Sequence, residues 1–322
     1  MTPTFNNRLS SIFLRFAIST GILIFLFLRI DFKNFFHIIK TANLKILLFV
    51  FFLNLSVYFL AFLRWMITVK NLKIEIPWRI LLESFCGGVF FNLFLPSTIG
   101  GDIVRIADLS LRFHKAKEVT ASVFLDRLSG YLGLEIMLIF ALILGYKLIF
   151  DRLIFFIALG FSALLFALLF VLFNNFLYTK LNRFLQRFNN RFFSNLAQIH
   201  NYIYYFKYQK IAAFNSILIS LFIQVIGVWG GFFTMLSFDK LINIGYFFIL
   251  VPLIGAITVL PISIGGLGVR EATIVYFFSR LNLSPDICLA VSLLGFAFNI
   301  LISGLGGIYY ALTLHFRRIQ SH

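Results

Sequence analysis

Charged side chains inside apolar stretches are the residues of this sequence with the clearest chemical potential. The set comprises Glu83, Asp102, Arg105, Asp108, Asp126, Arg127, Glu135, Arg270 and Glu271. A charge at the centre of a membrane helix is costly, so such a side chain faces a partner, a cavity or water. The guanidinium fork of arginine matches the oxygens of a lipid phosphate, and nearby carboxylates can balance its charge. Taken together, these residues indicate a polar cavity within the membrane.

Internal neutralisation is the competing explanation for any single residue of this set. The available pairs are Asp102 with Arg105, Arg270 with Glu271, and Asp126 or Glu135 with an arginine of the other half. Buried pairs of this kind fix packing without contacting a ligand. In a helix, Arg127 and Glu135 share one face and Asp126 points about 100° away, so one helix can present charge to two neighbours.

Two ten-residue segments resemble each other closely. PSTIGGDIVR at 96–105 and PISIGGLGVR at 261–270 share proline, isoleucine, both glycines, valine and arginine. An apolar run precedes each segment, at 79–95 and 245–260, which favours duplicated halves over chance convergence of glycine-rich turns. Proline and paired glycines break a helix and leave backbone groups that need partners. The freed amides that can assist phosphate binding are those of Gly100, Gly101, Gly265 and Gly266.

Signals of catalysis are weak in this sequence. The histidines at 37, 114, 200, 315 and 322 lack metal-ligand spacing, and neither a phosphate-binding loop nor a nucleophile elbow is present. Cys86 and Cys288 both lie in apolar stretches. We therefore expect no catalytic residue, no metal site and no cofactor. An intramembrane enzyme is the weakest alternative, since it requires a carboxylate pair such as Asp102 and Asp126 beside a reactive lipid bond.

The composition is that of a membrane protein. The 322 residues are 61% hydrophobic and 12% charged, with a mean hydropathy of +0.96. Apolar runs predict six spanning helices at 12–30, 45–66, 119–145, 153–173, 211–236 and 286–314. We predict an all-α polytopic bundle with two further re-entrant or broken-helix hairpins in inverted halves. A single integral membrane domain, 1–322, then consists of half one at 1–173, a basic linker at 174–210 and half two at 211–322.

Basic residues indicate how the helices are oriented. The net charge of +16 resides mainly in short segments between apolar runs, which argues against nucleic-acid binding. The basic linker, Arg317 and Arg318 favour a cytoplasmic C-terminus, and Arg8 favours a cytoplasmic N-terminus in a plasma (inner) membrane. Arg64 then lies in a cytoplasmic connection. The first hairpin would enter from the cytoplasm and the second from outside, as in inverted repeats of transporters.

The linker has an amphipathic pattern. Leu177, Leu181, Phe184, Phe188 and Phe192 recur at three- and four-residue spacing beside a basic stripe. This pattern predicts a helix on the membrane surface, with a solvated linker helix as the alternative.

Three motifs carry a resemblance to a known family. At PSTIGGDIVR, at VFLDRLSGYLGL (123–134) and at PISIGGLGVRE (261–271), the sequence resembles the flippase-like family typified by the transmembrane domain of lysylphosphatidylglycerol synthases. The motif positions, which the resemblance implies line a lipid head-group cavity, are Pro96, Gly100, Gly101, Asp102, Arg105, Asp126, Arg127, Pro261, Gly265, Gly266, Gly268, Arg270 and Glu271. Full synthases carry a soluble catalytic domain, whereas this sequence extends only a few residues past its last apolar run. The resemblance therefore implies no aminoacyl transfer here.

The expected activity is translocation of a lipid between leaflets. The resemblance implies a phospholipid or polyprenyl-linked lipid as substrate, and Arg105, Arg127 and Arg270 are expected to meet its phosphate. The alternative is a non-transporting membrane partner that presents lipid to a separate glycosyl- or aminoacyl-transferase.

Overall fold

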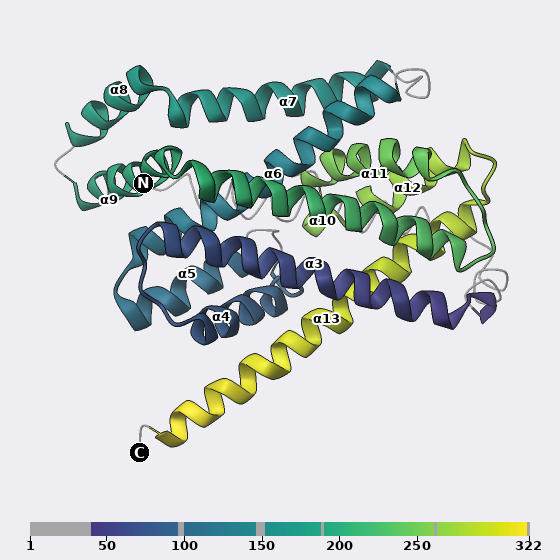
Figure 1. Ribbon diagram of the computed structural model, residues 1–322, viewed down its shortest axis with the longest axis horizontal. Coiled ribbons are helices and arrows are strands. Elements are labelled where there is room, and N and C mark those ends of the chain that lie inside the picture. The colour runs from purple at the N-terminus through teal and green to yellow at the C-terminus, as the bar shows by residue number, and fades with distance from the viewer. Residues whose placement is uncertain (1–39, 96–99, 146–151, 188–189, 261–262, 321–322) are drawn as a thin grey trace, which may run out of the picture.

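A computed structural model describes residues 40–95, 100–145, 152–187, 190–260 and 263–320, and these ranges fold entirely as helices and connecting turns. The helices are α3 (Leu44–Asn71), α4 (Trp78–Phe91), α5 (Gly100–Phe113), α6 (Ala116–Leu144), α7 (Arg152–Phe173), α8 (Asn175–Gln186), α9 (Arg191–Tyr205), η1 (Phe206–Tyr208), α10 (Lys210–Leu236), α11 (Ile244–Val259), η2 (Ile264–Gly266), α12 (Val269–Ser279) and α13 (Pro285–Gln320). Figure 1 shows them gathered into one elongated bundle.

Five of these helices are long and apolar enough to cross a membrane. They are α3, α6, α7, α10 and α13. At 1.5 Å per residue, the 28 residues of α3 reach about 42 Å, beyond the roughly 30 Å of a bilayer core. The spans expected at 45–66, 119–145, 153–173, 211–236 and 286–314 are therefore confirmed, and the one expected at 12–30 lies outside the described residues.

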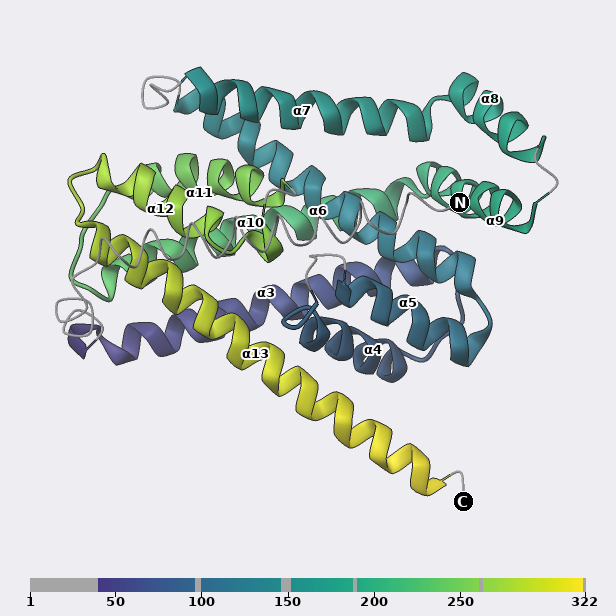
Figure 2. The same cartoon turned by 180° about the vertical axis from the view of Figure 1, so that it is seen from behind.

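The two expected hairpins are present as pairs of shorter helices. α4 packs against α5, and α11 packs against α12. The second break is built on positive φ angles at Gly265, Gly266 and Gly268 (60°, 79° and 81°), which residues with a side chain rarely adopt. In both Figure 1 and Figure 2 the inner ends of the hairpins lie near the middle of the bundle, and the hairpins open toward opposite ends.

The linker forms two helices instead of the single amphipathic helix expected through Phe192. α8 ends at Gln186, and α9 begins at Arg191 with Asn190 as its N-cap. α8 exposes Phe176 and Phe184, and its placement on a membrane surface stays a prediction. α9 packs on α6 instead, where the Tyr202 hydroxyl donates to Glu118 at 2.8 Å.

Helix α6 is the organising element of the described fold. It packs against α3, α5, α7, α9, α10 and α11. Small residues let these neighbours approach: a Cβ on Gly133 would lie 2.5 Å from the Cβ of Ser220 on α10. A charged residue on α6 therefore faces several helices at once.

Candidate functional site

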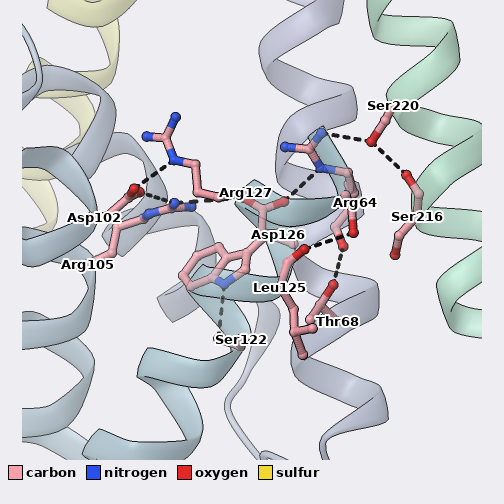
Figure 3. A network of polar contacts seen from close by, with 12 residues as sticks. Arg64, Thr68, Asp102, Arg105, Ser122, Leu125, Asp126, Arg127, Ser216 and Ser220 are labelled. Atoms are coloured by element: carbon pink, nitrogen blue, oxygen red, sulfur yellow. Dashed lines mark hydrogen bonds and ion pairs between the residues drawn. The ribbon is translucent and has the colours of Figure 1, made fainter. Parts of the chain in front are cut away.

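A cluster of ionised side chains lies where α3, α5 and α6 meet (Figure 3). Asp102 and Arg105 come from α5, Asp126 and Arg127 from α6, and Arg64 from α3. Asp102 accepts from Arg105 and, at 2.7 Å, from the Nε of Arg127. Asp126 accepts from the Nε of Arg64 at 2.8 Å and lies 3.8 Å from Arg105. We call these five residues the arginine–aspartate cluster.

The cluster forms a chain with an arginine at each end. Its order is Arg127, Asp102, Arg105, Asp126, Arg64, so each carboxylate is shared by two guanidiniums. Three arginines against two aspartates leave one excess positive charge. A buried charge is stabilised by an opposite one, so this count makes the cluster a candidate for binding an anion.

The two ends of this chain differ in environment. At one end Arg64 is buried, and its Nη1 donates to the Ser220 hydroxyl at 2.9 Å. A Cβ on Gly130 would lie 3.0 Å from the same Nη1, so the glycine makes room for the guanidinium. At the other end the Arg127 side chain is 36% exposed, and its Nη groups point away from Asp102 in Figure 3. An incoming anion therefore meets Arg127 first.

Arg105 occupies the middle of the chain within an aromatic cage. Its guanidinium carbon lies 4.6 Å from the ring centroid of Trp65 and 5.5 Å from that of Phe85. The Trp65 indole donates to Ser122 at 3.2 Å, which holds the ring in place. The aromatic faces and shared carboxylates stabilise an arginine that is only 5% exposed.

The glycine pair at the start of α5 serves helix packing. A Cβ on Gly101 would lie 2.0 Å from the carbonyl oxygen of Gly88, so α4 and α5 touch backbone to backbone here. The Gly101 amide donates to the Asn92 side chain at 2.9 Å. This amide therefore already has a partner within the hairpin.

The second hairpin carries a smaller charged group. Glu271 is fully buried and accepts from Arg270 at 2.6 Å, from the Gly268 amide at 2.7 Å and from Ser292 at 3.1 Å. The carboxylate thereby caps the first turn of α12. Arg270 also stacks over Phe296, 5.4 Å from its centroid.

A cavity of about 320 Å³ lies beside Arg270, between α3, α10, α11, α12 and α13. Its polar lining is sparse and comprises Arg270, Asn54, Asn299, Thr234, Thr258 and Ser292. Arg270 is the one cation of this lining, so the cavity can hold a single anionic group against otherwise neutral walls.

The structure brings together some of the predicted site residues and separates others. Asp102, Arg105, Asp126 and Arg127 meet in the first half, whereas Arg270 and Glu271 pair with each other in the second. Pro96 and Pro261 lie outside the described residues. Both simple pairs, Asp102 with Arg105 and Arg270 with Glu271, are formed.

The remaining predicted charges lie elsewhere. Arg112 pairs with Asp108 and with Glu83 toward the open end of the first hairpin. Asp126 pairs with Arg64 and Arg105 of its own half, contrary to the expected pairing across halves, because α3, α5 and α6 pack together. Within the described ranges, no three His, Cys, Asp or Glu side chains are grouped so as to hold a metal ion.

Sequence reasoning missed Arg64. We expected it in a cytoplasmic connection, but α3 continues to Asn71 and buries Arg64 with 8% exposure. Its position within the apolar run at 45–66 was the available signal. A run that contains a single arginine near its end is equally compatible with a helix that simply ends there.

Comparison with known proteins agrees with this architecture. The family model described as the lysylphosphatidylglycerol synthase transmembrane region matches residues 12–307. No curated protein and no solved structure matches the chain. The match covers α3 to α12, most of the span in α13, and both charged groups. The chain therefore belongs to the lysylphosphatidylglycerol synthase transmembrane family, and it is a multi-pass membrane protein related to lipid modification or translocation.

Proposed function

We propose that this protein moves a lipid with a phosphate-containing head group, a phospholipid or a polyprenyl phosphate, from one leaflet to the other. The observation that carries the proposal is the excess positive charge of the arginine–aspartate cluster, in which Arg64, Asp102, Arg105 and Asp126 are buried and Arg127 is partly exposed. A phosphate supplies the balancing charge, and arginine binds it with a fork of parallel donors.

The head group enters by exchange of ion-pair partners. Asp102 is shared between Arg105 and Arg127, so a phosphate can take over Arg127 while Asp102 keeps Arg105. No buried charge is left unpaired during this exchange. The cost of removing one partner from a buried pair, about 3–5 kcal/mol, is thereby avoided.

An apolar groove offers a place for the lipid tail. A cavity of about 540 Å³ between α3, α4 and α13 is lined by Phe52, Phe59, Phe62, Phe85 and Leu305 among others. Phe85 also forms one wall of the Arg105 cage. A lipid can therefore keep its chains in the groove while its phosphate reaches the charged cluster.

In this proposal the second hairpin binds the head group after the first. Its cavity holds Arg270, and the hairpin opens toward the opposite end of the bundle from the first one (Figure 1). Inverted hairpins that meet near the middle of a membrane are typical of alternating access. The basic linker supports an orientation in which the α8 and α9 end of the bundle faces the cytoplasm of a plasma membrane, and we propose that both termini lie on that side.

Leaflet exchange in proteoliposomes tests the proposal. Purified protein is reconstituted with fluorescent phosphatidylglycerol or a fluorescent polyprenyl phosphate, and exchange is followed by quenching the outer leaflet. Arg127→Ala should slow the initial rate at least about tenfold, which corresponds to about 1.4 kcal/mol of lost phosphate binding. Arg127→Lys should recover part of the rate, since a point charge replaces a fork.

Arg183→Ala is the matched control, because Arg183 is an exposed arginine of α8 far along the chain from the cluster. It should leave the rate within about twofold of the unchanged protein. Folded protein that exchanges neither lipid would contradict the proposal. Equal slowing by Arg127→Ala and Arg183→Ala would refute the role of the cluster.

Lipid presentation to a separate transferase is the second candidate. The family description, the transmembrane region of a synthase, favours it because such a region serves an enzymatic partner. Under this proposal a glycosyl- or aminoacyl-transferase co-purifies with the protein, and the protein alone exchanges no lipid. Exchange by the isolated protein rules it out as the sole function.

A further inference from the structure

Glu135 is a buried carboxyl on α6 that lies apart from the arginine–aspartate cluster. The residue is 2% exposed, and neither carboxyl oxygen has a hydrogen-bond partner in the described part of the chain. Ser162 of α7 lies beside it, but the Ser162 hydroxyl donates to the Ala158 carbonyl at 3.1 Å. In that orientation Ser162 Oγ can accept a further hydrogen bond, which a carboxylic acid can donate and a carboxylate cannot. The local geometry therefore allows Ser162 to accept from Glu135 when Glu135 carries a proton.

Within the described ranges, no ion pair joins Glu135 to a cation. The ionisable groups on α7, α9, α10 and α11 are Arg152, Arg191, His200, Tyr202, Tyr204, Tyr205, Lys210 and Tyr246. Arg152 and Lys210 each stand at the first residue of their helix. The charges that α3 and α5 present to α6 belong to the arginine–aspartate cluster, about 12 Å along α6 and already paired.

Helix α7 covers the Glu135 carboxyl and packs against the bundle through one narrow face. Five described α7 residues, Ala158, Phe161, Ser162, Leu165 and Leu172, are buried, while most of the other described residues of α7 are exposed. Figure 1 shows α7 along one edge of the bundle. An unpaired carboxylate is strongly disfavoured away from water, so Glu135 holds its proton while α7 covers it. Separation of α7 from α6 admits water and permits release.

Glu135 lies between the two hairpins on the helix that contacts both. Toward its N-terminus α6 carries Asp126 and Arg127 of the cluster. On the other side, a Cβ on Gly255 of α11 would lie 3.0 Å from Leu134, the residue before Glu135. A change in packing at Glu135 therefore acts on the first-half cluster and on the second hairpin together.

We propose that Glu135 is a proton-binding site that couples lipid exchange to a proton gradient across the membrane. The coupling rests on the proposed function, whereas proton binding does not. In each cycle the carboxylate takes one proton from water on one side, becomes the neutral acid under α7, and returns that proton to water on the other side. The step needs no other reactant.

Leaflet exchange with and without a pH gradient tests the coupling. In proteoliposomes with a fluorescent anionic phospholipid, a gradient of about one pH unit should change the initial rate at least threefold, within the tenfold limit for one proton. Glu135→Gln keeps the shape but cannot ionise, so exchange should continue with no response to the gradient. Glu118→Gln, on the same helix but bonded to Tyr202, is the control and should respond like the unchanged protein.

Infrared spectroscopy tests proton binding without any transport. The unchanged protein at neutral pH should show the carbonyl band of a protonated carboxyl that is missing in Glu135→Gln and present in Glu118→Gln. Absence of that difference overturns the proton site. If the band is present but no lipid moves, the proton site stands and the coupling is refuted together with the proposed function. Exchange that ignores the gradient, or a gradient response retained by Glu135→Gln, refutes the coupling alone.

Discussion

The two hairpins share a sequence motif but differ in how their buried charges are paired. In the first half, five ionised side chains from three helices form the arginine–aspartate cluster, and each aspartate serves two arginines. In the second half, Glu271 pairs with one arginine, Arg270. Its carboxylate also accepts hydrogen bonds from the Gly268 amide and the Ser292 hydroxyl. The first arrangement joins helices to one another, whereas the second mainly caps its own helix.

The packing around the two charged groups also differs. The first hairpin is closed by backbone contact between Gly88 and Gly101. The second faces a cavity of about 320 Å³ in which several glycines have open space where a side chain would stand. The first hairpin is therefore closed at its glycine pair and borders the apolar groove of about 540 Å³ on α4, whereas the second borders a cavity beside its own arginine.

The largest expected difference between the halves concerns loss of a carboxylate. Asp126→Asn leaves Arg64 and Arg105 short of a buried anion and should lower the free energy of unfolding by about 3–5 kcal/mol. Glu271→Gln should cost less, about 1.5–3 kcal/mol, because the Arg270 side chain is 22% exposed and the amide can still accept from Gly268. Denaturant unfolding in detergent measures both.

Asp239→Asn is the control for these carboxylate substitutions, since Asp239 is exposed and its φ of 56° suits asparagine. It should change stability by less than about 0.5 kcal/mol. Equal losses for Asp126→Asn and Glu271→Gln would erase the distinction between a cluster that joins helices and a local cap.

Glycine substitutions compare the packing of the two halves. Gly101→Ala places a methyl group 2.0 Å from the Gly88 carbonyl, and backbone atoms cannot give way, so stability should fall by about 1–3 kcal/mol. Gly227→Ala, in the α10 wall of the second cavity, meets nothing within 4 Å and should be neutral or stabilise by up to about 1 kcal/mol. Thermal unfolding in detergent compares the two. A loss at Gly227 as large as that at Gly101 would show that both halves are closed.

The smallest expected effect lies in the linker between the halves and depends on pH. Burial lowers the pKa of His200, which packs beside Tyr178 and is 6% exposed. Because the folded state binds the proton less well than the unfolded one, the contact is fully stable above about pH 6.5. It weakens as pH falls below that value, by at most about 1.4 kcal/mol per pH unit.

Hydrogen exchange of α9 measures this linker effect. Protection corrected for intrinsic rates should fall between about pH 7.5 and about pH 5.5, and His200→Gln should remove the pH dependence. Helices α10 and α3 should not respond over the same range. A decrease in protection throughout the chain would place the responsive group in one of the halves instead.

The sequence by itself determined where helices run and where they break. Apolar runs longer than a bilayer predict spanning helices because an unpaired backbone cannot exist in lipid, and α3, α6, α7, α10 and α13 follow these runs. The second break follows from glycines that permit positive φ, as at Gly265 and Gly266, whereas Gly100 and Gly101 of the first motif begin α5. These features depend on local chemistry and on the membrane alone.

Only the tertiary structure decided which charges meet. Arg64 joins Asp126 across 62 residues because α3 crosses α6 where Gly130 makes room for its guanidinium. Glu135 is also a carboxyl residue and lies nine residues along the same helix, yet it lies beside Ser162 of α7 and has no arginine partner among the described residues. Pairing between distant side chains depends on which helix lies against which face, and helix crossing is set by packing over the whole bundle, which no local pattern encodes.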